Sequence, residues 1–189
     1  MKIDASALRQ GNIVEHQGKL WRVAKAEFGK RAQAAAVVQV ELRNVIDGYK
    51  LNERFRSSEQ IEVVRLEQRE FQYLFKEGDA FTFMDQQTFE QITLPRELIG
   101  EEPSKFLQDG MIVSIESYDE KPISVSLPDK VKLRVVEADA TVKGQTAAAS
   151  YKPALLENGV KVLVPPHIEI GARIVVSTSD GTYVERAKD

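Results

Sequence analysis

The chain has 189 residues, a net charge of −3 and no cysteine, which excludes disulfides, thiolate metal sites and cysteine nucleophiles. It contains no run of about 18 apolar residues and no apolar leader at its N-terminus, so we expect neither a membrane span nor a signal peptide. These features favour a cytoplasmic protein that does not bind membranes.

The charges are distributed unevenly along the chain. Residues 1–64 carry 11 Lys/Arg and 8 Asp/Glu, residues 65–128 carry 6 and 13, and residues 129–189 carry 9 and 8. An acidic middle segment therefore lies between two segments that are basic or nearly neutral. A polyanion, if the protein binds one, should contact the two end segments.

The first segment is predicted to contain about five short strands. Gly18 marks a turn between two short apolar-rich runs, and Asp47-Gly48 predicts a second hairpin. Alternating apolar and polar residues over 38–43 indicate a strand with one buried face. We expect the runs 19–25 and 37–45 to be the arms of one long hairpin. This strand density favours a small SH3-like barrel.

The tip of that predicted hairpin covers residues 27–36 and combines two adjacent cations with small side chains. Lys30 and Arg31 are followed by Ala32, by the neutral amide Gln33 and by Ala34. The positive charge suits a polyanion, and the alanines permit close approach of the backbone. A solvated, mobile loop is the alternative interpretation of the same residues.

The middle segment is predicted to form a second small barrel. Strands are expected at 71–75, 80–84, 111–117 and 123–127, while 88–94 fits either a strand or a loop. Residues 95–99 and 103–107 are predicted to form short helical turns, because each begins with a proline, which suits the first helical position.

The last segment has the clearest strand alternation, over residues 130–135. Asn158-Gly159 and Asp180-Gly181 each predict a hairpin, while residues 139–150 are polar, small and without a pattern. About five strands again favour an OB-like barrel. The predicted fold class is therefore all-β, with three small β-barrels over 1–64, 65–128 and 129–189.

No catalytic constellation stands out in the sequence. His16 and His167 fall in different predicted domains, and there is no Gly-rich phosphate loop, zinc-ligand spacing or G-x-S-x-G motif. The acidic residues Glu116, Asp119 and Glu120 are more typical of a solvated turn than of a cation site. We therefore predict a binding protein without a cofactor or metal. An enzyme remains an alternative only if its site lies across a domain interface.

Several stretches, taken together in their order and spacing, resemble one known family. They include GNIVEHQGKLWRV at 11–23, FTFMDQQTFEQITLP at 81–95 and GTYVERAKD at 181–189, with longer matches over 37–75 and 106–176. The family that they resemble is bacterial translation elongation factor P, and the resemblance covers essentially the whole chain. It implies a KOW-type, SH3-like domain with its tip loop at 28–36, followed by two OB-fold domains.

The resemblance also implies a function and a set of partners. Members of this family bind the 70S ribosome between the P and E sites and help peptide bonds to form at consecutive prolines. The implied partners are therefore the ribosome, its RNA and the P-site tRNA, and the implied protein is a monomer.

The tip departs from the family pattern of lysine-proline-glycine-lysine-glycine, whose second lysine commonly carries an enzyme-added extension. The ungapped alignment places Lys30 on the first lysine and Gln33 on the modified one. Gln33 has neither an amine to acylate nor a guanidinium to glycosylate. This leaves open an ordinary family member, a specialised or modification-independent paralogue, or a degenerating duplicate. A shifted alignment would instead place Lys30 or Arg31 at the apex.

Two further regions are implied to contact RNA. The loop Lys143, Gly144, Gln145 and Thr146 would lie near the small subunit and the E-site codon, although family members often have aspartate where Gln145 stands. Tyr183 and Arg186 would face tRNA or ribosomal RNA, although Tyr183 is equally typical of an ordinary strand aromatic. A generic OB-fold RNA-binding module that never enters the ribosome remains another alternative for the function of the whole chain.

Overall fold

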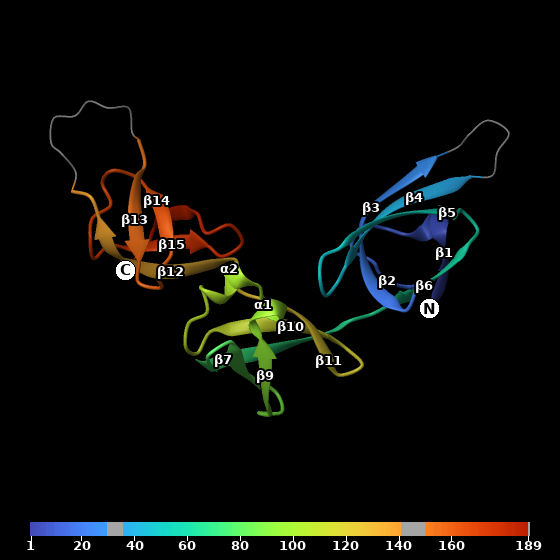
Figure 1. The fold of residues 1–189 in the computed structure, drawn as a ribbon, viewed down its shortest axis with the longest axis horizontal. Helices are drawn as coiled ribbons and strands as arrows, with labels where there is room; N and C mark the ends of the chain where they lie inside the picture. Colours follow the sequence, from blue (N-terminus) through green and yellow to red (C-terminus); the bar gives the residue numbers. More distant parts are fainter. Residues whose placement is uncertain (30–35, 141–149, 189) are drawn as a thin grey trace. The chain divides into compact units, whose positions relative to one another are not determined.

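The computed structural model describes residues 1–29, 36–140 and 150–188, and three β-sheets make up most of its regular structure (Figure 1). Only three short helical elements occur in these ranges, namely η1 (Ala5–Ala7), α1 (Arg96–Ile99) and α2 (Glu101–Ser104). The predicted all-β fold class is confirmed. No helix within the described ranges is long and apolar enough to cross a membrane.

The first sheet has six strands in the order β1-β6-β2-β3-β4-β5. They are β1 (Lys2–Asp4), β2 (Ile13–His16), β3 (Lys19–Gly29), β4 (Val37–Asn44), β5 (Lys50–Arg56) and β6 (Gln60–Val64). The predicted turn at Gly18 is present, with φ of 54° at Gln17 and 73° at Gly18, as a two-residue hairpin loop with two left-handed positions requires. Alternate side chains of β3 and β4 fill the core beneath the sheet, with Val23, Val38 and Leu42 completely buried.

The structure differs from the sequence prediction at two places in this sheet. Strand β1 was not predicted, because three residues with one apolar side chain give no periodicity; its backbone pairs with β6, from Lys2 opposite Glu62 to Asp4 opposite Gln60. Strand β3 continues to Gly29 rather than ending at Lys25, and a β-bulge interrupts its pairing with β4 between Val23 and Lys25. Glu27, Phe28 and Gly29 therefore belong to the hairpin arm and not to the tip.

The second sheet has five strands in the order β11-β10-β7-β8-β9. They are β7 (Glu67–Glu77), β8 (Ala80–Asp85), β9 (Gln91–Pro95), β10 (Ile112–Tyr118) and β11 (Lys121–Ser126). The ambiguous stretch 88–94 is thus resolved as a turn followed by β9. Tyr73, Phe81 and Phe83 are buried here, and the Tyr73 ring centroid lies 6.2 Å from that of Phe81 and 5.5 Å from that of Phe83.

The helical turns of this segment begin elsewhere than predicted. Pro95 is the extended residue that precedes α1, and α2 begins at Glu101, so Pro103 is its third residue rather than its first. Both arrangements are compatible with proline, because the first N–H groups of a helix have no intrahelical acceptor. Gly100, at φ 99°, separates the two turns.

The third sheet has five strands in the order β14-β13-β12-β15-β16, and its two edge strands approach each other. They are β12 (Lys130–Ala138), β13 (Lys152–Leu156), β14 (Lys161–Val164), β15 (Arg173–Ser177) and β16 (Tyr183–Arg186). Phe106, which follows α2 in the chain, is buried in the core of this barrel. A hydrogen bond accompanies it, in which the side chain of Asn158 donates from Nδ2 to the Lys105 carbonyl at 2.9 Å.

The described chain divides into two compact units. One comprises residues 1–68 together with 115–124, and the other comprises residues 69–114 together with the chain from 125 onward. Within the first unit, the Arg22 guanidinium of β3 lies 3.3 Å from the Glu116 carboxylate of β10. Within the second, Phe106 joins the middle segment to the C-terminal barrel.

Candidate functional site

The arms of the β3–β4 hairpin remain paired as far as the tip. Glu27 lies opposite Gln39, Phe28 opposite Val38 and Gly29 opposite Val37. Beyond the tip, the Ser57 amide donates to the Ala36 carbonyl at 3.0 Å. The predicted tip residues lie outside the described ranges; they are Lys30, Arg31, Ala32, Gln33 and Ala34. The structure therefore describes the strands β3 and β4 that support the predicted site, but not the site itself (Figure 1).

Sequence reasoning missed an aromatic contact at the end of this support. Phe28 is 56% exposed, and the Arg9 guanidinium carbon lies 5.7 Å from the centroid of its ring. Arg9 is itself oriented, since its Nη1 donates to the carbonyls of Leu8 at 2.9 Å and Ser6 at 3.2 Å. This cation–π contact orients the ring of Phe28, which is the last side chain of β3 before the tip. An aromatic residue beside a basic tip was the only available sequence signal.

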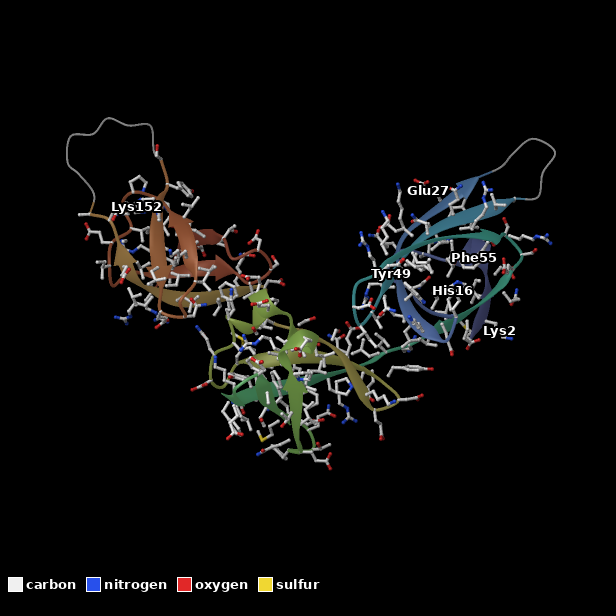
Figure 2. All side chains as sticks on the ribbon, in the orientation of Figure 1. Lys2, His16, Glu27, Tyr49, Phe55 and Lys152 are labelled. Atoms are coloured by element: carbon white, nitrogen blue, oxygen red, sulfur yellow. The ribbon has the colours of Figure 1, made fainter. Side chains whose placement is uncertain are left out.

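A shallow hollow of about 450 Å³ lies across β3, β4 and β5, and its lining has as many acidic as basic side chains. Lys25 pairs with Glu27 at 2.7 Å, and that hydrogen bond raises the pKa of Lys25 (Figure 2). Glu41 lies 3.3 Å from both Arg43 and Lys50. Because the charges around the hollow balance, the hollow itself offers little net attraction for a polyanion.

The two predicted contact residues of the last segment lie on β16, an edge strand of the third sheet. Tyr183 is half-buried and packs against the core, whereas Arg186 is exposed. The ring of Tyr151, which the sequence analysis missed, lies 6.4 Å from that of Tyr183 at an interplanar angle of 89°. Burial, followed by the neighbouring Tyr151 and Glu185, raises the pKa of Tyr183. The Tyr183 ring thus packs against the core of the C-terminal barrel.

The predicted loop of this barrel also lies outside the described ranges, and it comprises Lys143, Gly144, Gln145 and Thr146. Its flanks are tied together, because Lys152 Nζ donates to the Asp139 carbonyl at 2.5 Å (Figure 2). Tyr151 is 55% exposed directly after this loop. An exposed aromatic ring therefore follows the predicted loop within a few residues along the chain.

The remaining candidates have structural explanations. Asp119 and Glu120, at φ 48° and 63°, form the turn between β10 and β11, and Glu116 accepts a hydrogen bond from Ser124 Oγ at 3.1 Å. The ring of His16 packs edge-on against that of Phe55, with 5.5 Å between the ring centroids. Its Nε2 lies 3.4 Å from Oε1 of Glu53. In the described ranges, no group of three or more His, Asp or Glu side chains is placed to hold a metal ion.

Family models match the chain in three consecutive parts. The KOW-like domain of elongation factor P matches residues 4–61, its OB domain matches residues 66–125 and its C-terminal domain matches residues 131–186. A solved structure with a similar fold is eukaryotic translation initiation factor 5A from Methanococcus jannaschii. Its TM-score is 0.56 at 22% identity, and the match covers 68% of this chain and 92% of that one. The solved structure supports the fold alone, whereas the three family models define a translation elongation factor.

Curated relatives cover the full length. Elongation factor P of Rhizorhabdus wittichii is 56% identical over 187 residues, which cover 99% of this chain and 100% of that protein. Elongation factor P of Zymomonas mobilis is likewise 56% identical over 187 residues, with the same coverage. The chain belongs to the elongation factor P family.

Proposed function

We propose that this elongation factor binds the 70S ribosome between the P and E sites and promotes peptide-bond formation at stalled polyproline sequences. The observation that carries the proposal is the match, at 56% identity, to the whole length of elongation factor P proteins. In this proposal the chain acts as a monomer with three domains, 1–64, 65–128 and 129–189. It contributes no catalytic group or cofactor.

The proposed mechanism is positioning of the P-site tRNA. Proline is a poor reactant because its ring restricts the geometry of attack. Holding the acceptor end of the tRNA in its reactive pose lowers the entropic part of the barrier. The β3–β4 hairpin supports this role, because its arms stay paired as far as Gly29 and Val37, close to both ends of the tip in the chain.

Within the tip, each residue type has a proposed role. Lys30 and Arg31 neutralise nearby phosphates, while Ala32 and Ala34 permit close packing against RNA. Gln33 hydrogen-bonds a ribose hydroxyl or a base edge of the acceptor end, since its amide both donates and accepts. Because Gln33 lacks an amine or guanidinium, we propose that the factor works without a modification at this position.

The C-terminal barrel is proposed to contact the small subunit and RNA. Lys143, Gly144, Gln145 and Thr146 would lie near the E-site codon, and Arg186 and Tyr183 near tRNA or ribosomal RNA. The exposed position of Arg186 on an edge strand and the aromatic pair of Tyr183 with Tyr151 support this assignment. Aromatic rings and guanidinium groups are the side chains that contact unpaired nucleotides.

A competition experiment tests the proposed location. Labelled protein should bind 70S ribosomes that carry a P-site tRNA, and deacylated tRNA in the E site should displace it, because both would occupy the same space. Binding that is insensitive to E-site tRNA would contradict the proposal. Equally tight binding to free RNA would instead favour a generic OB-fold RNA-binding module.

A further inference from the structure

The turn between β8 and β9 holds an exposed phenylalanine in an unfavourable backbone conformation. Phe89 has φ of 63°, in the left-handed region where the Cβ atom of a bulky residue crowds the backbone. Glycine and asparagine are the usual residues at such positions. Phe89 is also 69% exposed, so its ring gains little burial in return. Neither local conformation nor packing accounts for a phenylalanine here.

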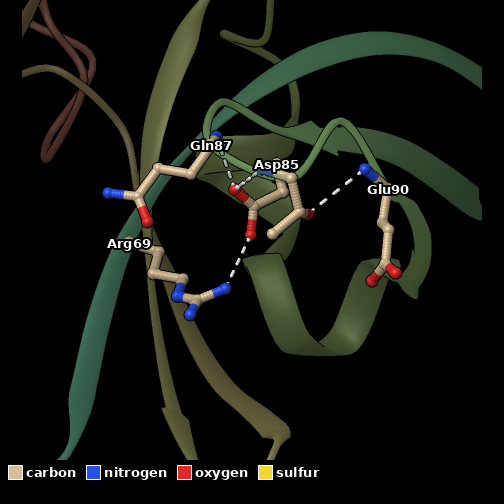
Figure 3. Close-up of polar contacts among 5 residues, drawn as sticks. Arg69, Asp85, Gln87 and Glu90 are labelled. Atoms are coloured by element: carbon tan, nitrogen blue, oxygen red, sulfur yellow. Dashed lines mark hydrogen bonds and ion pairs between the residues drawn. The ribbon is translucent and has the colours of Figure 1, made fainter.

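Hydrogen bonds around Asp85 hold this turn in place (Figure 3). The Asp85 side chain is nearly buried, and its Oδ1 accepts from the backbone amides of Gln87 at 2.7 Å and Thr88 at 3.1 Å. Its Oδ2 lies 3.1 Å from Nη1 of Arg69. The Phe89 amide donates to the Asp85 carbonyl at 2.9 Å. Strained residues persist only where their surroundings fix them in this way, and they occur often at functional sites.

The same turn contains a second costly feature. Gln86 Nε2 is buried and has no hydrogen-bond partner among the residues that the structure describes. A buried amide without a partner loses its hydration without compensation. The rigidity of the turn is therefore maintained against two unfavourable features, which indicates that its shape matters for something other than stability.

The charge of this part of the chain indicates what the ring would meet. Residues 69–114 carry 4 Lys/Arg and 9 Asp/Glu. Glu90, next to Phe89, and Glu70, whose carbonyl accepts from the Gln86 amide at 3.1 Å, are both exposed. The guanidinium of Arg69 faces Asp85. Phosphates would be repelled from such a surface, whereas a basic protein surface would be attracted.

We propose that Phe89 is an anchor, presented by the Asp85-stabilised turn, for a basic protein of the ribosome. Its ring would enter an apolar pocket that Lys or Arg side chains surround, and these would face Glu70 and Glu90. Buried aromatic anchors supply much of the affinity of protein interfaces. A turn that is already ordered loses little entropy when it binds. This inference rests on the proposed function, because it takes the ribosome as the source of the partner.

The test uses the substitution Phe89→Gly in the full-length protein. Glycine tolerates the left-handed conformation, so the melting temperature should not fall. Affinity for 70S ribosomes with a P-site tRNA and an empty E site should fall by about tenfold or more, as loss of an anchor predicts. The matched control is Phe75→Thr, which removes a phenylalanine that is 49% exposed on β7 of the same segment. It should leave the affinity unchanged.

The outcomes separate the anchor from the proposed function. If the wild-type protein does not bind ribosomes, both are wrong. If wild type and Phe89→Gly bind equally, the anchor is wrong and the proposed function stands. Photo-crosslinking with p-benzoylphenylalanine at position 89 identifies the partner. A crosslink to a ribosomal protein supports the proposal, and crosslinks to ribosomal RNA alone would overturn it.

Discussion

At the residue scale, the carboxylate of Asp85 organises the turn that carries Phe89. Hydrogen bonds from the amide of Gln87, and then from Thr88 and Arg69, lower the pKa of Asp85 below its ordinary value of 3.8, although burial acts in the opposite direction. The folded state therefore binds the Asp85 proton less tightly than the unfolded state does. The resulting stabilisation is present above pH 3.8 and is lost as the pH falls through the lower, folded pKa.

The substitution Asp85→Asn should therefore lower the melting temperature at pH 7, and the difference from wild type should shrink below pH 3.8. Calorimetry at pH 7 and at acid pH measures both effects. Asp79→Asn is the control, because Asp79 pairs with Arg96 at 3.1 Å but its side chain is 78% exposed. Such exposed pairs contribute little. A difference for Asp85→Asn that stays constant with pH would contradict this role.

The proposed mechanism also depends on the side-chain amide of Gln33. Gln33→Ala should reduce the rate of Pro-Pro bond formation by about two- to tenfold, the range expected for one lost hydrogen bond of ~0.5–1.5 kcal/mol. Single-turnover dipeptide synthesis measures this rate. Lys30→Ala is the companion variant. A silent Gln33→Ala beside a severe Lys30→Ala would instead make Lys30 the apex residue.

At the element scale, the chain after α2 stabilises a barrel that begins more than twenty residues later. Phe106 is 2% exposed within the C-terminal core, beside Leu133 and Ile168. Gln108 Nε2 adds a hydrogen bond to the Lys132 carbonyl at 3.0 Å. The folding of the last barrel thus depends on a side chain from the middle segment.

Replacing Phe106 with alanine should destabilise this barrel by about 3–5 kcal/mol, because it leaves a large cavity. Hydrogen exchange should become faster in β12 and β14. Trp21, the only tryptophan, is buried in the first sheet, so its fluorescence should report an unchanged first unit. Phe75→Ala, at an exposed site, should have little effect. Unaltered exchange in β12 would show that Phe106 is dispensable.

The sequence predicted those elements whose local signals agree with their tertiary environment. Gly18, Gly48, Gly159 and Gly181 all adopt positive φ in the turns where hairpins were expected. Strand β1 could not be found, because its formation depends on the distant edge of β6. The tip residues were singled out from sequence alone. The Tyr151–Tyr183 pair and the left-handed Phe89 could not be, since both depend on three-dimensional context.

At the scale of the whole molecule, charge separates the segments. The acidic excess lies in residues 65–128, which carry 6 Lys/Arg and 13 Asp/Glu, whereas residues 1–64 carry 11 and 8. The hollow across β3, β4 and β5 is electrically balanced, with three basic and three acidic side chains. Lys30 and Arg31, in contrast, are adjacent cations without an acidic neighbour in residues 28–36.

Reversal of Lys30 and Arg31 together to Glu should therefore weaken ribosome binding strongly and reduce its dependence on salt. The matched reversal of Lys76 and Lys105 should do little, because Lys76 is exposed on the acidic segment and Lys105 pairs with Glu102 at 2.9 Å. Binding titrations at two salt concentrations make the comparison. Equal losses from both pairs would show that the tip makes no special electrostatic contact.

In the proposed mechanism, the factor acts by positioning the tRNA with an unmodified tip. A glutamine amide nitrogen is a poor nucleophile, because its lone pair is delocalised into the carbonyl. The most direct measurement is Pro-Pro synthesis in a reconstituted translation system with recombinant protein, whose intact mass shows no added group. We expect this recombinant protein to accelerate synthesis as well as protein purified from its native host does. Inert recombinant protein beside active native protein that carries added mass on a tip residue would contradict it.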